Sequence, residues 1–204
     1  MDKKSLVSDI IRLEWEMFTT TRNAGGRASC QDDKTTFEIM RGAQHEVWSL
    51  DTLISYRNDL EQAKQQEINL VAIKYARMMK LTFPDEYERI EHLLPPVTEN
   101  AGRLADEISK RHTDRSLAAA KEYPKLISMG RPVTTESSRA GHWAAMDNYL
   151  HSELLTYSEA TLELCLRDTL RYESRGVNMA LLILENTAVR YGYPSLDALE
   201  AALP

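Results

Sequence analysis

Residues 44–79 read QHEVWSLDTLISYRNDLEQAKQQEINLVAIKYARMM, and residues 153–188 read ELLTYSEATLELCLRDTLRYESRGVNMALLILENTA. Aligned without gaps, the two stretches share five identities in 36 positions, where roughly two are expected by chance. Both carry apolar residues at the spacing of amphipathic helices. The pattern predicts two equivalent helix pairs. The alternative is that two amphipathic helix pairs resemble each other through composition alone.

Helical periodicity continues on both sides of these stretches, and the breaks fall where Gly and Pro gather. Gly25–Gly26, Pro95–Pro96 and Gly130–Pro132 interrupt helices, whereas Pro84 suits a first turn. We predict an all-α fold, a single compact helical domain over residues 1–204, with two pseudo-symmetric halves at about 1–95 and 97–204. The ten expected helices are at about 4–20, 36–47, 50–66, 69–81, 84–93, 98–122, 139–155, 158–174, 177–191 and 195–202.

Charge and composition exclude several classes of protein. The 204 residues include 25 Lys and Arg against 31 Asp and Glu, a net charge of −6. Without a basic footprint, nucleic acid is not expected as a partner. No apolar run approaches the roughly 20 residues that span a membrane, so no membrane contact is expected. The two cysteines, Cys30 and Cys165, form no disulfide framework, which suits a reducing cytoplasm.

Four of the expected helices each place one carboxylate or carboxamide on the apolar face. On the first helix, Glu14 lies within the arc of apolar residues, whereas Glu16 lies on the outer face. Gln44 lies inside the arc of the second helix. Glu153 lies inside the arc of the equivalent helix, at the position that aligns with Gln44. In the ninth helix, leucines and a valine surround Glu185.

An isolated buried carboxylate is costly, so it must raise its pKa or find a partner. We predict a polar cavity between the halves, where Glu14, Glu153 and Glu185 act as catalytic acid/base groups or bind a cation or amine. The alternative is a satisfied buried network that fixes helix register. Candidate partners are Arg27, Arg77, Arg131, Tyr75, Tyr149, Tyr157 and Trp15.

The stretch Gly25–Asp33 (GGRASCQDD) is the densest polar segment of the chain. Its glycines let backbone N–H groups turn toward an anion, and Arg27 could clamp a carboxylate or phosphate with two hydrogen bonds. Its serine or Cys30 could be a nucleophile if a base approaches. The alternative is a helix–helix connection in which Asp32 or Asp33 caps the next helix.

A metal centre is a further hypothesis. The carboxylates of Glu14, Glu153 and Glu185 could hold a hard cation, with a carboxamide replacing one ligand. The chain has no Glu-x-x-His, the spacing that ferritin-like di-iron sites use. His45 and His151 lie off the apolar centre of their helices, so we expect them at the surface or the rim.

Several strings of the sequence together match one known pattern, among them GRASCQDD (26–33), KYARMM (74–79), ELLTYS (153–158) and ILENT (183–187). By these strings the chain resembles a bacterial family of about 200 residues, catalogued as a domain of unknown function. The family occurs in anaerobes and actinobacteria, sometimes beside a nucleotidyltransferase-like domain. The resemblance covers nearly the whole chain and implies a stand-alone bacterial cytoplasmic protein, but no activity and no catalytic residues. His92 and His151 stand where the family has other residues.

Three hypotheses follow for the function. The first is an enzyme or binder whose inter-helical cavity takes a small anionic or amine-bearing ligand, with Arg27 and Arg131 orienting the anionic group. The second is a carboxylate-ligated metalloprotein. The third is an interaction module with a structural polar core, working with a nucleotidyltransferase partner. No cofactor and no oligomeric state follow from the sequence. The candidate ligand-binding residues are Arg27, Cys30, Gln31, Gln44, Tyr75, Arg77, Arg131 and Tyr157.

Overall fold

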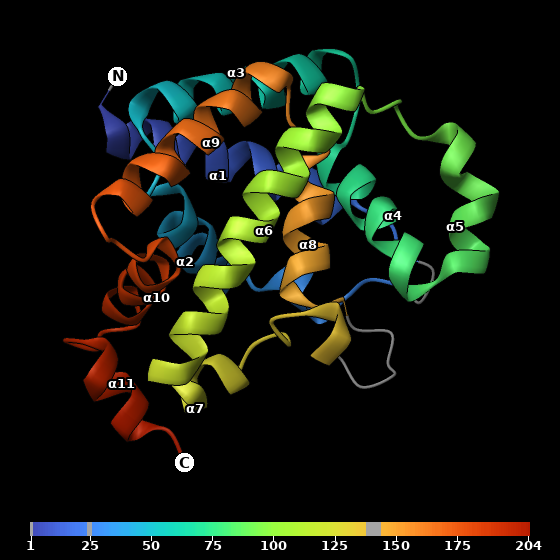
Figure 1. Cartoon of the computed structure of the whole chain (residues 1–204). Helices are drawn as coiled ribbons and strands as arrows, with labels where there is room; N and C mark the ends of the chain where they lie inside the picture. The colour runs from blue at the N-terminus through green and yellow to red at the C-terminus, as the bar shows by residue number, and fades with distance from the viewer. Residues whose placement is uncertain (1, 24–25, 138–143) are drawn as a thin grey trace.

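The computed structural model describes residues 2–23, 26–137 and 144–204. The described residues form helices and connections without a strand, which confirms the predicted all-α class (Figure 1). Short 3₁₀ turns lie at Ser29–Asp32, Glu91–Leu93 and Thr135–Ser137. The helices are α1 (Lys3–Thr20), α2 (Lys34–His45), α3 (Leu50–Gln65), α4 (Leu70–Thr82), α5 (Pro84–Ile90), α6 (Glu99–Glu122), α7 (Pro124–Ser128), α8 (Met146–Leu154), α9 (Glu159–Ser174), α10 (Met179–Arg190) and α11 (Leu196–Ala202).

The starts of the helices follow the sequence signals closely. The Ser158 side chain accepts a hydrogen bond from the Thr161 backbone N–H, and Ser195 caps α11 in the same way. Pro84 occupies the first turn of α5, where its missing N–H costs nothing. The helix expected over residues 139–155 differs, because α8 begins at Met146. Residues 139–143 of that prediction lie outside the described part of the chain.

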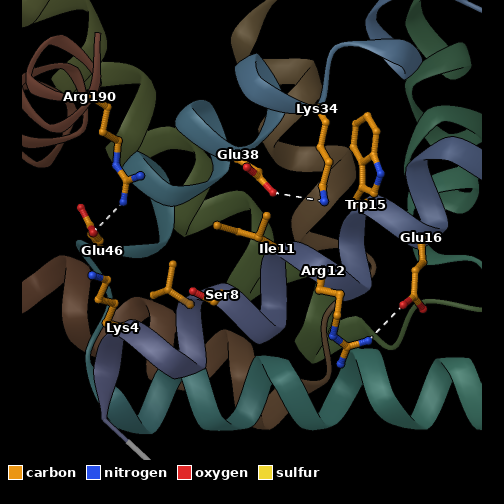
Figure 2. A pocket seen from close by; sticks show the side chains of 11 residues that line it. Lys4, Ser8, Ile11, Arg12, Trp15, Glu16, Lys34, Glu38, Glu46 and Arg190 are labelled. Carbon is orange, nitrogen blue, oxygen red and sulfur yellow. Dashed lines mark hydrogen bonds and ion pairs between the residues drawn. The ribbon is translucent and has the colours of Figure 1, made fainter. Parts of the chain in front are cut away.

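Two sets of helices pack in corresponding ways. Helix α1 contacts α2, α3 and α4, whereas α6 contacts α8, α9 and α10. Across the two sets, α3 packs on α9, α4 on α8, and α2 on α10. On the side away from α3, α1 borders a groove shared with α2 (Figure 2).

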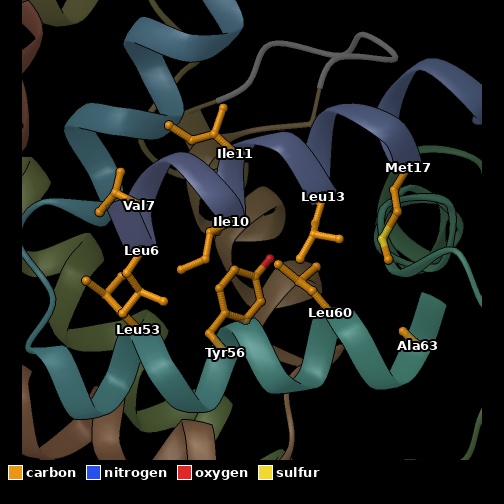
Figure 3. Packing of buried hydrophobic residues seen from close by; sticks show 10 residues of the cluster. All are labelled: Leu6, Val7, Ile10, Ile11, Leu13, Met17, Leu53, Tyr56, Leu60 and Ala63. Carbon is orange, nitrogen blue, oxygen red and sulfur yellow. The ribbon is translucent and has the colours of Figure 1, made fainter. Parts of the chain in front are cut away.

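The apolar core follows this arrangement. One cluster lies between α1 and α3, where Leu13 and Leu60 meet in the interior (Figure 3). A second cluster joins α6, α8 and α9 and contains the buried Cys165. Trp48 and Tyr157, which occupy aligned positions in the two stretches of sequence, pack against both clusters. The core therefore passes from one set of helices to the other without a gap at their boundary.

Two aspartates tie the helix sets together reciprocally. On α9, Asp168 accepts hydrogen bonds from the Ser49 N–H (2.8 Å) and the Thr52 hydroxyl (2.6 Å) at the start of α3. Asp59, on α3, accepts them from the N–H of Ser158 (3.0 Å) and from the threonine hydroxyl three residues later (2.6 Å). All six positions are identities of the sequence alignment. These contacts support the two pseudo-repeats, which stay a prediction.

Candidate functional site

The Arg41 side chain on α2 lies buried between two carboxylates, Glu14 on α1 and Glu153 on α8. Its Nε donates to Glu14 Oε2 (2.8 Å), and its Nη2 donates to the other oxygen of the same carboxylate. Nη2 also donates to Glu153 Oε1 (2.9 Å), and Nη1 donates to Glu153 Oε2 (3.3 Å) and to Gln44 Oε1 (2.6 Å). A guanidinium has five N–H donors, so the Arg41 donors are fully used.

Lys74 on α4 extends the network toward the outside of the fold. Its ammonium donates to Glu153 Oε2 (3.1 Å) and to the Tyr149 hydroxyl (2.7 Å). The Lys74 Nζ also lies 4.1 Å from the Tyr149 ring centroid and 5.2 Å from that of Tyr75. The Arg131 guanidinium packs over the same Tyr149 ring, at 5.0 Å from its centroid. Two cations therefore share one aromatic ring at this end of the network.

Two tyrosines and a histidine complete the hydrogen bonding of the carboxylates. The Tyr56 hydroxyl donates to Glu14 Oε1 (2.8 Å), and His45 Nε2 lies 3.0 Å from Glu14 Oε2. The Tyr157 hydroxyl donates to Glu153 Oε1 (3.0 Å). Among the described residues, the buried His45 Nδ1 has no hydrogen-bond partner.

Burial and ion pairing shift the pKa values of these groups in opposite directions. Burial by itself raises the pKa of Glu14, but Arg41 and His45 outweigh it and hold that pKa well below its usual range. For Glu153, burial is likewise outweighed by Arg41 and Lys74, and the pKa falls to about 2. Burial lowers the pKa of Lys74, but Tyr149 and Glu153 raise it above its usual range. At neutral pH both carboxylates and both cations are therefore charged.

The structure brings together three of the four polar residues expected to point inward. Glu14 and Glu153 are only 2% and 7% exposed, which confirms the prediction of buried carboxylates. Gln44 and Glu153, the aligned pair, bind the same guanidinium. The prediction for Glu185 is wrong, because this side chain is exposed on α10. The neighbour taken to mark its buried face, Val189, is itself 58% exposed.

The polar loop after α1 closes on that helix. Arg27 donates to the backbone carbonyls of Thr19 (3.0 Å) and Gln31 (2.9 Å) and pairs with Asp32. Cys30 is exposed. The Asp33 side chain caps α2 by accepting from the Thr36 N–H. This loop is thus a helix–helix connection with Asp33 as the cap of α2, and the Arg27 guanidinium is hydrogen-bonded within the connection.

Gln31 is the buried centre of the loop. Its Nε2 donates to the carbonyls of Phe18 (2.8 Å) and Thr21 (2.9 Å) at the end of α1. Its Oε1 accepts from the Asn23 side chain (2.9 Å) and from the Ala28 N–H (3.0 Å). All four hydrogen-bonding positions of the carboxamide are satisfied within the loop, so Gln31 fixes the turn.

The remaining predicted ligand-binding residues separate into two places. Tyr75, Arg131 and Tyr157 border the network at Lys74 or Glu153. Arg131 also donates to the Ala144 carbonyl (2.9 Å). Arg77 lies elsewhere: its Nη2 donates to the carbonyl of Pro95 (2.7 Å), and burial lowers its pKa.

Three charged or polar members of the network were missed by the sequence analysis: Arg41, Lys74 and His45. We expected His45 at the surface or rim, yet it is 2% exposed and contacts Glu14. Its spacing carried a signal, because Arg41 and His45 lie four residues apart and Arg41 follows Phe37 by four. Arg41 and His45 therefore share a face of α2 with Phe37, a member of its apolar arc.

The arrangement limits the chemistry open to this site. The described part of the chain holds no group of three or more His, Cys, Asp or Glu side chains that could bind a metal ion. The Arg41 guanidinium occupies the space between the two buried carboxylates. A carboxylate with a lowered pKa that is hydrogen-bonded on both oxygens is a weak base. Glu14 and Glu153 are thus both ion-paired in this network, and their role as acid/base groups stays a prediction.

A family model described as a protein of unknown function (DUF4125) matches residues 4–201. The match covers nearly the whole chain and confirms the predicted resemblance. Comparison with curated proteins and with solved structures gives no match. Within the described residues, no helix is long and apolar enough to cross a membrane.

Proposed function

The chain belongs to the DUF4125 family, and we propose that it binds a small anionic molecule at the outer end of its buried charge network. The binding groups are Lys74, Tyr75 and Arg131, arranged around the Tyr149 ring. This proposal keeps the small-molecule binding hypothesis and moves its site away from the carboxylates.

The observation that carries the proposal is the unused donor capacity beside Lys74. An ammonium has three N–H donors, and Lys74 uses two of them, on Glu153 and Tyr149. Burial raises the pKa of the nearby Tyr75 to about 12, so its hydroxyl keeps its proton. That hydroxyl makes no hydrogen bond within the described residues. An ammonium N–H and a phenol O–H are therefore available to an anion.

The charges around this point favour an anion over an amine. Lys74 and Arg131 both lie against Tyr149, and like charges held close together repel. An anion between them would be attracted to both. An amine would add a third positive charge to the same place.

The carboxylates act as positioning groups in this proposal. Glu153 holds the Lys74 ammonium, and Arg41 holds Glu153 and Glu14 in turn. The full use of the Arg41 donors supports the alternative of a structural polar core for that inner part. The two roles are compatible, because a rigid inner network fixes the outer donors.

Thermal unfolding tests the proposal, with inorganic phosphate and citrate as probes at constant ionic strength. A ligand at ten times its Kd stabilises by about 1.4 kcal/mol, or a Tm rise of roughly 3–6 °C for a domain of this size. We expect this rise with at least one probe in the wild type and its loss in Tyr75→Phe and Arg131→Gln. Tyr191→Phe, at an exposed tyrosine that follows α10, is the matched control.

Phosphate and citrate also stabilise proteins without binding them, by exclusion from the surface. That effect is equal in the wild type and the variants, so only the difference between them reports on the site. Equal Tm rises in the wild type, Tyr75→Phe and Arg131→Gln would contradict the proposal.

A further inference from the structure

We propose that the groove between α1 and α2 is a separate binding site for an apolar or aromatic molecule that carries a single negative charge. The groove has a volume of about 430 Å³ (Figure 2), which is within the range of small-molecule sites. It shares no residue with the cluster around Lys74 and Tyr149. The proposal is therefore independent of the function proposed above.

The inner wall of the groove is apolar. Val7 and Ile11 lie one helical turn apart on α1, and Trp15 follows after another turn. The Trp15 ring is held by Phe37 on α2, with ring centroids 5.1 Å apart. Val7 and Ile11 are themselves only 4% and 9% exposed, so the half-buried Trp15 ring is the main apolar group of this stripe that a ligand can reach. The Ser8 hydroxyl, exposed between them, makes no hydrogen bond within the described chain.

Three ion pairs stand around the rim. Arg12 pairs with Glu16 (3.0 Å), and the pair of Lys34 with Glu38 (3.5 Å) lies on α2. At the other end, the Arg190 guanidinium pairs with Glu46 (2.7 Å). The guanidinium rests against α2 at Gly42, where a Cβ atom would lie 2.7 Å from its Cζ. Each carboxylate of the rim is thus already compensated by a cation.

Lys4 is the remaining charged group of the groove. Among the residues that the structure describes, it has no carboxylate within ion-pair distance and no hydrogen bond to its ammonium. The lining therefore has one positive charge in excess of its three carboxylates. This imbalance selects a ligand with one negative charge and disfavours an amine.

The dimensions favour a small ligand over a protein partner. Lys4 and Trp15 are eleven residues apart on α1, which is about 16 Å at 1.5 Å per residue. A specific protein interface buries about 800 Å² on each partner, more than a groove of about 430 Å³ offers. A carboxylate beside Lys4 with its apolar body toward Trp15 matches this length.

The test uses 8-anilinonaphthalene-1-sulfonate, an aromatic monoanion whose fluorescence rises in apolar sites, with decanoate and decylammonium as competitors. We expect one dye molecule per chain, displaced by decanoate and not by decylammonium. Lys4→Gln should weaken dye binding about three- to fivefold, the effect of one exposed charge. Lys4→Arg, which keeps the charge, should bind as the wild type does, and Ser8→Trp should abolish binding by filling the groove.

Lys4 and Ser8 are both exposed, and a circular dichroism spectrum shows that each variant is folded. Unchanged dye affinity in Lys4→Gln and Ser8→Trp would overturn the proposal, and so would the absence of binding in the wild type. Displacement by decylammonium as strong as by decanoate would overturn its charge selectivity. Tyr75→Phe should leave dye binding intact, which keeps this test separate from that of the anion site.

Discussion

Replacing Arg41 by Met should destabilise the protein by about 3–5 kcal/mol at pH 7, the cost of removing one partner from a buried ion pair. The substitution keeps a long unbranched side chain and removes all five hydrogen bonds to Glu14, Gln44 and Glu153. Glu153 would retain Lys74, and Glu14 would retain Tyr56. We therefore do not expect twice the cost, although both carboxylates lose the Arg41 guanidinium.

Urea unfolding followed by circular dichroism measures this change. Arg190→Met is the matched control, because it removes an arginine from an exposed pair with Glu46, where a loss of about 0–1 kcal/mol is expected. Arg41→Lys, which keeps the charge, should fall between the two. A total stability of about 5–15 kcal/mol leaves room for the loss.

The pH dependence of Arg41→Met gives a second readout. Without the guanidinium, burial raises the pKa values of Glu14 and Glu153. As the pH falls, these carboxylates take up protons, which removes the cost of their buried charges and raises the stability of the variant. In the wild type both pKa values are lowered, and acid removes stability instead. The difference between the two proteins should therefore shrink between pH 7 and pH 4. A loss below about 1 kcal/mol that does not change with pH would refute the importance of this network.

Three further outcomes are expected. Because the pKa of Glu153 falls from its usual 4.5 to about 2, it contributes about 3 kcal/mol at neutral pH. That contribution should disappear as the pH falls from about 4.5 to 2, and Glu153→Gln should flatten this part of a stability–pH curve. Asp168→Asn and Asp59→Asn should each cost about 1–3 kcal/mol in urea unfolding, since each removes a reciprocal charged acceptor; a loss in only one of them would contradict their equivalence. Glu185→Gln should change stability by less than about 0.5 kcal/mol, because the side chain is exposed, and a loss above 2 kcal/mol would place it in the core.

Most of the fold could be predicted from the sequence, because the capping residues and prolines agreed with the helical period of the apolar residues. Ser158 both ends one connection and caps α9, and Pro84 could only begin a helix. The expected helix over residues 98–122 matches α6 within one residue at its start. The start of α8 at Met146 was not foreseen, because residues before it have a helical period without a capping side chain.

The candidate site could be predicted only in part from the sequence. A helical-wheel projection of the sequence identifies polar residues on an apolar face, and it identified Glu14, Gln44 and Glu153. It does not tell a buried Arg from one whose long stem covers the surface with its charge in water. Arg41 was therefore missed, although it shares the face of Gln44. Glu185 was wrongly predicted to point inward. It lies on an apolar face, but such a face lies in the interior only where another helix covers it.

The hydrogen bonds across the two helix sets bear on the speed of folding. Helical proteins fold fast when their contacts are local, and contacts between distant residues slow them. Here Arg41 meets Glu153 at a separation of 112 residues, and Ser49 meets Asp168 at 119. On a growing chain, Arg41 and Glu14 emerge long before the second carboxylate exists. The ion pair between Arg41 and Glu153 can thus form only after residue 153 has been synthesised, and the buried network stays incomplete until then.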